Sequence, residues 1–204
     1  MRDTRTITQP AVSVRLRLFL LALVALLPWA AAYGQTNVTP EEVKAAFLLR
    51  FAGFVEWPAQ ARTDQQLVIG VVDAGDVEAE LRRYAELCAA GQRPVVRSVE
   101  TPADLAGVHI FFIGGREPAR LSRWIAAARS LPILLVTDAP DGLERGSMIN
   151  FITTDRVQFE AATETATRAG LRLNPRLLSV ATRVKKGEAG GDTLLAGQRA
   201  LHCA

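Results

Sequence analysis

Apolar and polar positions along the chain predict strands and helices in alternation. Between residues 67 and 137, short continuous apolar runs are separated by segments in which apolar residues recur at helical spacing. Continuous apolar runs of this length are typical of parallel strands that are buried on both faces. The predicted strands of this part are 67–72, 95–99, 109–113 and 133–137, and the predicted helices between them are 77–90 and 118–129.

A further helix is predicted before the first of these strands. Thr39 and Glu42 have the spacing of a capping box, and Pro40 suits the first helical position. Apolar residues over 43–55 then recur at helical spacing, which indicates a face packed in the core rather than a ligand site. The helix is expected to end at Trp57, because a residue before proline avoids the helical conformation.

The last part of the pattern predicts a hairpin and two more helices. Strands at 148–152 and 157–160 are separated by the short connection of a hairpin. A helix at 162–169 stops at a glycine, and an Asn-Pro pair begins a last helix over 175–184. With the alternating part, these elements predict a three-layer α/β/α sandwich. Its sheet is mostly parallel, with an antiparallel hairpin at one edge and helices on both faces.

The first 34 residues have the pattern of a secretory signal peptide. Four arginines precede an apolar run over 18–27, and small residues follow at 30–32. The apolar run is shorter than the roughly 20 residues that span a bilayer, which favours a cleaved signal peptide over an uncleaved anchor helix. We therefore predict cleavage after Ala32, with Gly34 as the alternative site. The expected product is a periplasmic protein that does not insert into the membrane after cleavage.

The predicted organisation is one domain between a leader and a tail. The signal peptide takes residues 1–34, and the α/β domain takes residues 39–184. Residues 185–204 are rich in Gly, Lys and Ala without periodicity, so we predict a disordered tail. A mature chain of about 170 residues is long enough to bury a single sizeable core.

The charge of the mature chain does not support nucleic-acid binding. The chain has 24 basic and 21 acidic residues, but the leader contains four of the basic residues and one of the acidic residues. The remaining part therefore has 20 residues of each sign and no net charge. Because nucleic-acid binding relies on a basic surface, no nucleic-acid partner is predicted.

Polar residues and glycines follow three of the predicted strands and form a candidate ligand site. Asp73 follows the first strand, Gly114, Gly115 and Arg116 follow the third, and Asp138 follows the fourth. The carboxyl ends of parallel strands gather at one edge of a sheet, where α/β proteins bind ligands. Aspartates offer oxygen ligands to a divalent cation, and the Gly-Gly-Arg junction offers amides and a guanidinium to an anion. The alternative is that these residues only shape turns.

The sequence contains no set of residues that defines an active site. Its two histidines, His109 in a predicted strand and His202 in the tail, have no nucleophile and acid beside them. We therefore predict no enzymatic activity, no cofactor and no metal. The two cysteines, Cys88 and Cys203, allow a disulfide in an exported protein. The alternative is a buried thiol at Cys88 and a tail thiol that stays free or joins two copies.

Several motifs, in their order and spacing, resemble the YfiR family of periplasmic regulators. The resemblance covers roughly residues 43–184 and implies a periplasmic α/β protein that is not an enzyme. It also implies that the protein binds an inner-membrane diguanylate cyclase or sensor protein and represses it, so that cyclic-di-GMP output falls, and that it forms a homodimer. The motifs are Phe51-x-x-Phe54-Val55-Glu56-Trp57-Pro58, Leu67 to Val72, Ile133 to Asp138, Gly146-Ser147-Met148-Ile149-Asn150-Phe151, Gln158-Phe159-Glu160, and Ala169 to Leu178.

The chain departs from the family pattern at two places. The family often has Asn two residues after the Glu of the hairpin motif, where this chain has Ala162. The family also often has cysteines at the strand positions aligned with Gly70 and His109, so a disulfide between those strands cannot form here. The alternative function is a periplasmic module that binds a small molecule, such as an anion or a nucleotide, at the strand ends described above.

Overall fold

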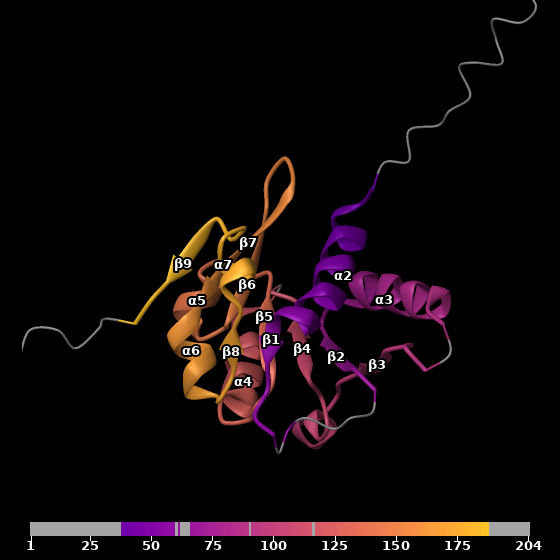
Figure 1. The fold of residues 1–204 in the computed structure, drawn as a ribbon, viewed down its shortest axis with the longest axis horizontal. Helices are drawn as coiled ribbons and strands as arrows, with labels where there is room; N and C mark the ends of the chain where they lie inside the picture. The colour runs from indigo at the N-terminus through magenta and orange to yellow at the C-terminus, as the bar shows by residue number, and fades with distance from the viewer. Residues whose placement is uncertain (1–37, 60, 62–65, 90, 116, 188–204) are drawn as a thin grey trace, which may run out of the picture. The chain divides into compact units, whose positions relative to one another are not determined.

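The protein is described by a computed structural model that covers residues 38–187 except 60, 62–65, 90 and 116 (Figure 1). The predicted signal peptide lies outside the described residues. The helices, with 3-10 helices labelled η, are α2 (Pro40–Phe51), η2 (Ala52–Phe54), α3 (Gly75–Leu87), η3 (Pro102–Leu105), α4 (Pro118–Ala128), α5 (Gly142–Arg145), α6 (Thr163–Arg168) and α7 (Pro175–Leu178). The strands are β1 (Val55–Glu56), β2 (Val68–Val72), β3 (Val95–Ser98), β4 (Ile110–Ile113), β5 (Leu134–Thr137), β6 (Ile149–Thr153), β7 (Val157–Ala162), β8 (Arg172–Leu173) and β9 (Arg183–Lys185).

The main sheet of the described part has seven strands in the order β3-β2-β4-β5-β6-β7-β9. The first five strands of this order pair in parallel, whereas β6 and β7 pair antiparallel and β9 pairs parallel with β7. The predicted α/β fold with a mostly parallel sheet and a hairpin is therefore confirmed. The hairpin does not form the edge of the sheet as predicted, because β9 pairs with the outer side of β7.

The prediction that the last helix runs to Val184 is wrong. The helix α7 ends at Leu178, and the chain then joins the sheet as β9. The Thr182 amide donates to the carbonyl oxygen of Phe159 at 2.9 Å just before the strand begins. The outer side of β7 offers unpaired backbone groups to this segment, which a longer helix would leave without partners. The predicted tail begins inside this strand, at Lys185, and lies outside the described residues from position 188 onward.

Helices α2 and α3 pack against each other and against one face of the sheet (Figure 1). Phe47 and Phe51 of α2 contact the rings of Phe151 and Phe159, with ring centroids 5.2 to 6.0 Å apart. Both phenylalanines of the hairpin are buried, as is Phe51. The aromatic residues of the first helix therefore pack in the core, as the sequence predicted.

Helices α4 and α5 lie on the opposite face of the sheet (Figure 1). Phe111 of β4 packs edge-on against Trp124 of α4, with ring centroids 5.7 Å apart. The helix α5 approaches β6 so closely that a Cβ atom on Gly142 would lie 2.3 Å from Oδ1 of Asn150. Asn150 precedes Phe151 in β6, so the two side chains point to opposite faces. The three predicted layers are present.

The strands β1 and β8 form a second, antiparallel sheet that the sequence did not predict. The amide of Asn174 donates to the carbonyl oxygen of Phe54 at 2.9 Å beside it. The first helix accordingly ends at Phe51 rather than Trp57. Strands of two residues are too short to show a periodic pattern. Since β1 and β8 each belong to a motif of the family resemblance, the two motifs lie side by side in this small sheet.

The other predicted elements agree with the structure to within a few residues. The helix α5 and the 3-10 helix η3 were not predicted, because both lie in segments with no apolar periodicity. The capping box at the start of α2 is present as predicted. Within the described part of the chain, no helix is long and apolar enough to cross a bilayer.

Candidate functional site

The carboxyl ends of β2, β4 and β5 bring four of the predicted ligand residues together. The Gly114 amide donates to the carbonyl oxygen of Val72 at 2.9 Å, and a Cβ atom on Gly114 would lie 2.1 Å from the carbonyl oxygen of Asp73. The amide of Gly115 donates to Oδ1 of Asp138 at 2.7 Å. Only glycine permits this close approach of two strand ends. Arg116, the fifth predicted residue, lies outside the described residues.

Asp138 is bound within the protein on both of its carboxylate oxygens. Its Oδ1 accepts the amide of Gly115, and its Oδ2 accepts Nζ of Lys44 at 2.7 Å. Lys44 belongs to α2, and its side chain is 10% exposed. The sequence did not suggest this partner, which lies 94 residues away. Asp138 therefore joins the first helix to the end of the sheet, and a ligand would have to compete with these contacts.

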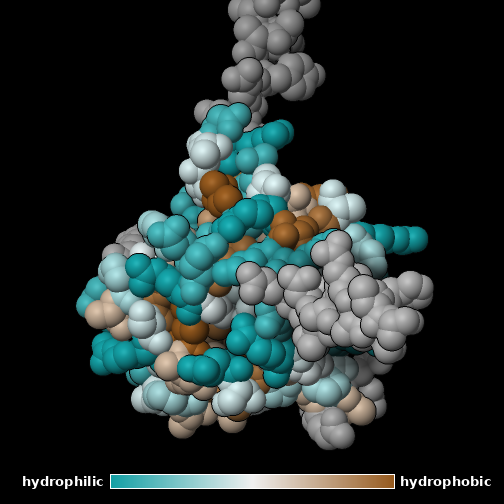
Figure 2. Space-filling model, turned by 90° about the vertical axis from the view of Figure 1, so that its left-hand side faces the viewer, coloured by the Kyte–Doolittle hydropathy of each residue, from teal (hydrophilic) through white to brown (hydrophobic). Residues whose placement is uncertain are grey.

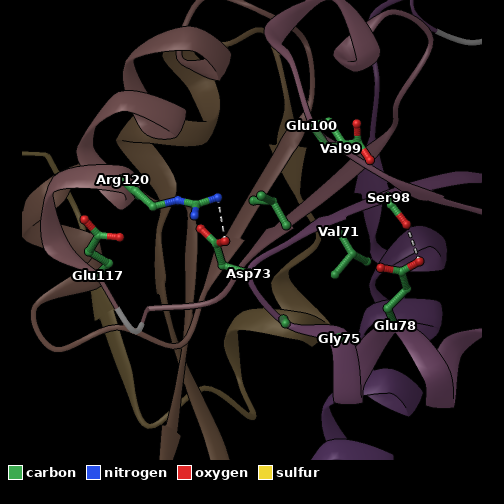
Figure 3. Close-up of a pocket in the computed structure, with 11 residues that line it drawn as sticks. Val71, Asp73, Gly75, Glu78, Ser98, Val99, Glu100, Glu117 and Arg120 are labelled. Carbon is green, nitrogen blue, oxygen red and sulfur yellow. Dashed lines mark hydrogen bonds and ion pairs between the residues drawn. The ribbon is translucent and has the colours of Figure 1, made fainter.

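Asp73 lines a cavity of about 590 Å³ that lies between α3, the end of β3 and the start of α4. Asp73 has a left-handed backbone conformation, with φ at 56°. In Figure 3, the side chains of Asp73 and Arg120 point toward each other, and Arg120 Nη2 lies 2.8 Å from Oδ1 of Asp73. On the opposite wall, the hydroxyl of Ser98 donates to Glu78 at 2.5 Å (Figure 3). Asp73 thus sits in a cavity, whereas Asp138 does not line it.

The charges around this cavity oppose an anionic ligand. Among the described residues, which do not include Arg116, four carboxylates and one guanidinium, that of Arg120, line this cavity. An anion would therefore enter a region of net negative charge, where like charges repel. The volume is within the range of small-molecule sites, about 300–1,000 Å³. Ligand binding at the strand ends stays a prediction, and the geometry favours a cationic or neutral ligand over an anion. The four carboxylates are Asp73, Glu78, Glu100 and Glu117.

A buried chain of polar side chains crosses the other half of the sheet; we call it the Glu160 network. The hydroxyl of Thr137 donates to Oδ1 of Asn150 at 2.7 Å. The side-chain amide of Asn150 donates to Oε1 of Glu160 at 3.0 Å. Arg183 of β9 then donates through Nε to Oε2 of Glu160 at 2.7 Å and through Nη1 to Oε1 of Glu144 at 2.9 Å. The first three residues are almost fully buried.

The Glu160 network fixes the last strand to the sheet. The hydrogen bonds that Arg183 donates to Glu144 and Glu160 raise the pKa of its guanidinium, so Arg183 stays charged. The hydrogen bond from Arg183 in turn lowers the pKa of Glu144. Each buried polar atom of Asn150 and Glu160 has a partner, which is the condition under which such a network stabilises a fold.

The sequence contains a signal for this network, although the predicted site did not include it. Asn150 and Glu160 both stand in the motifs of the family resemblance, each beside a buried phenylalanine. In the hairpin they lie directly opposite each other on β6 and β7. A polar residue on a strand that is otherwise buried must find a hydrogen-bond partner, and the opposite strand is the nearest place for one.

Cys88 lies at the end of α3 and has no disulfide partner among the described residues. Its Sγ lies half-buried and donates to the carbonyl oxygen of Tyr84 at 3.4 Å, one helical turn earlier. Cys203 lies outside the described residues, so a disulfide between Cys88 and Cys203 stays a prediction. His202 also lies outside them, and the described residues contain no cluster of side chains with metal-ligand geometry.

We expect His109 to make the stability of the domain depend on pH. The Val68 amide donates to Nδ1 of His109 at 3.1 Å, and burial lowers the pKa of the imidazole below its ordinary value of 6.5. Below 6.5 the unfolded chain therefore binds a proton that the folded protein does not, so the free energy of unfolding should fall as the pH drops toward the folded-state pKa.

Urea unfolding at several values between about pH 7.5 and about pH 5.5 measures this dependence. His109→Gln keeps a side-chain acceptor near Val68 but removes the titrating group. The pH profile of the variant should therefore be flatter than that of the wild type. Two profiles with the same slope would show that His109 does not contribute.

These features define the protein as a mixed α/β domain that has a cavity at its strand ends and a last strand held by a buried polar network. The chain belongs to the YfiR/HmsC-like family, whose family model matches residues 41–182. No curated protein matches the chain. The match begins at the second residue of α2 and ends one residue before β9, so it contains nearly the whole described domain. The family resemblance of the sequence motifs is confirmed.

Proposed function

We propose that the protein is a periplasmic regulator without enzymatic activity, which binds an inner-membrane diguanylate cyclase or sensor protein and represses it. Membership of the YfiR/HmsC-like family, over residues 41–182, carries this proposal. The signal-peptide pattern of the first 34 residues supports the periplasmic location. Repression would lower the cellular level of cyclic-di-GMP.

A surface suited to a protein partner lies beside β7 and β9. A groove of about 260 Å³ is lined by Phe47, Val157, Phe159 and Val180, together with three polar residues. Val180 is 66% exposed, which is unusual for a residue of its size in this domain. Figure 2, which views the side of α5, α6 and β9, shows separate hydrophobic patches in a mainly hydrophilic surface. We propose that the periplasmic region of the cyclase or sensor binds at this groove, where apolar contacts are available.

Deletion of the gene should raise cyclic-di-GMP and biofilm formation, because the cyclase would lose its repressor. Expression of the wild-type protein should restore the low level, and Val180→Glu should fail to restore it, because a buried unpaired charge opposes docking. Leu87→Glu is the matched control, since Leu87 is 77% exposed on α3, outside the groove. Cyclic-di-GMP measured in cell extracts gives the result.

Unchanged cyclic-di-GMP in the deletion strain, with the cyclase expressed, would refute the regulatory proposal. Full restoration by Val180→Glu as well as by Leu87→Glu, with both proteins present at the wild-type level, would leave the regulatory proposal intact but place the contact surface elsewhere. The homodimer implied by the resemblance stays a prediction.

A small-molecule binding module is the second candidate function, and the cavity of about 590 Å³ at Asp73 favours it. Ligand binding to the folded state raises its melting temperature, since the unfolded chain does not bind. A thermal-shift screen with small cations, polyols, nucleotides and anions distinguishes the two functions. A clear shift that Arg120→Gln alters would support the module, because Arg120 lines this cavity beside Asp73.

A further inference from the structure

A second cavity, of about 430 Å³, lies between α4, α5 and α6. Three arginines line it, one from the end of each helix: Arg129, Arg145 and Arg168. We call this cavity the arginine groove. It shares no lining residue with the cavity at Asp73 or with the groove at Val180.

The three guanidiniums have no carboxylate partner among the described residues. Nε of Arg145 donates to the carbonyl oxygen of Pro140 at 3.3 Å, and Nη2 of Arg168 donates to the hydroxyl of Thr165 at 3.4 Å. Both contacts are long and their acceptors are neutral. Arg50, Arg93, Arg97, Arg123, Arg156 and Arg176 also form no ion pair among the described residues, whereas five arginines elsewhere in the domain pair with carboxylates. These five arginines are Arg82, Arg83, Arg120, Arg172 and Arg183.

Glu144 is the one carboxylate among the described residues that line the arginine groove, and it is already neutralised. Glu144 accepts Nη1 of Arg183 at 2.9 Å, and Nζ of Lys185 lies 3.9 Å from the same carboxylate oxygen. Arg183 also pairs with buried Glu160. These two cations and two carboxylates balance, so the three arginines of the groove leave a local excess of positive charge.

The ends of the three helices do not remove this excess. A long helix places about half a negative charge at its carboxyl end, and an arginine there is stabilised by it. The helices α5 and α6 have only four and six residues, so their dipoles are small. Three full positive charges therefore outweigh the partial charges of the helix ends. A favourable interaction with a helix end can account for each arginine by itself. It does not account for three arginine side chains that line the same cavity.

The chemistry of the arginine groove suits a phosphate-bearing anion. Guanidinium groups bind phosphate oxygens through paired hydrogen bonds, which are stronger than neutral ones. The hydroxyl of Thr165 adds a donor, and Ile125 forms an apolar part of the wall. The volume is within the range of small-molecule sites. We infer that the arginine groove binds a small polyanion that carries phosphate or pyrophosphate groups. This inference does not rest on the proposed repression of a cyclase.

Titration calorimetry of the purified protein with pyrophosphate and with inorganic phosphate tests the site. Wild-type protein should bind pyrophosphate, and the double variant Arg145→Gln/Arg168→Gln should bind it at least about tenfold more weakly, because two charge-assisted contacts are lost. The matched control is Arg50→Gln/Arg176→Gln. Both of its arginines are exposed, lie outside the groove and lose the same charge. The control should bind within about twofold of the wild type, because distant surface charges are screened by salt.

Two outcomes would overturn the inference: no binding of either anion to the wild type, or equal weakening in the groove variant and the control variant. Urea unfolding of both variants shows that the fold is intact, since exposed arginines contribute little to stability. A second experiment identifies the source of the phosphate. Sedimentation with phosphatidylglycerol vesicles, compared with phosphatidylcholine vesicles, supports a lipid headgroup if binding is lost in the groove variant. Binding of pyrophosphate without binding of vesicles supports a soluble phosphate compound.

Discussion

Replacement of Glu160 with alanine should lower the free energy of unfolding by about 3 kcal/mol, near the lower end of the range for breaking a buried ion pair. Glu160 is 4% exposed and accepts hydrogen bonds from Asn150 and from Arg183. Its removal leaves the buried amide of Asn150 without an acceptor, which costs the full desolvation of that group. The Arg183 side chain is half-exposed and can be solvated by water once Glu160 is gone, so the loss of stability should stay near the lower end of that range. Urea unfolding followed by circular dichroism measures it.

Glu144→Ala is the matched control, because Glu144 pairs with the same guanidinium but from the exposed side. Its side chain is 42% exposed, and an exposed ion pair contributes little to stability, so Glu144→Ala should lose much less stability than Glu160→Ala. Equal losses in the two variants would show that burial of the Glu160 network does not determine its contribution. Hydrogen exchange gives a second measurement. The Thr182 amide, which donates to Phe159 at the start of β9, should exchange faster in Glu160→Ala than in Glu144→Ala.

Gly114→Ala should also destabilise the domain, by about 3 kcal/mol or more. A Cβ atom at this position would lie 2.1 Å from the carbonyl oxygen and 2.7 Å from the carbonyl carbon of Asp73. Both are backbone atoms, so β2 and β4 must separate where the Gly114 amide donates to Val72. The shift would also displace Asp73 from its ion pair with Arg120. The melting temperature and the urea midpoint measure the loss.

Gly75→Ala serves as its control in the same strand-end region. A Cβ atom on Gly75 meets no atom within 4 Å, and Gly75 is the first residue of α3. Alanine there should leave stability unchanged or raise it by about 0.5 kcal/mol, because it restricts the unfolded chain and favours the helix. A Gly114→Ala variant as stable as Gly75→Ala would contradict the close approach of the two strand ends.

The elements that the sequence predicted well are those that carry their own local signals. The capping box of α2 forms as expected: the Glu42 amide donates to Oγ1 of Thr39 at 3.2 Å, and the Thr39 amide donates to Glu42 at 3.0 Å. The strands β2, β4 and β5 are continuous apolar runs because both of their faces are covered by helices. The last helix was predicted too long because the alternative, an edge strand, depends on β7, which lies more than 20 residues earlier in the chain.

The candidate sites likewise include contacts that could be predicted from the sequence and contacts that could not. The meeting of Asp73, Gly114 and Asp138 could be predicted, because parallel strands end at the same edge of a sheet. The partner of Asp138 could not, since Lys44 occupies a position in an amphipathic helix that is typical of the surface. The arginine groove also has no counterpart in the sequence pattern. Its arginines lie on three separate helices, each at an end where a cation is ordinary.

The sequence by itself determined the α/β class, the buried strands, the capped first helix and the family of this protein, because these depend on neighbouring residues and on the order of motifs. Only the tertiary structure decided which charges are paired. It paired Asp138 with Lys44 and Glu160 with Arg183, and in the described part of the chain it brought together three arginines that have no carboxylate partner. The reason is physical: the effect of a charge depends on its distance from other charges and on its burial, and neither can be read from spacing along the chain.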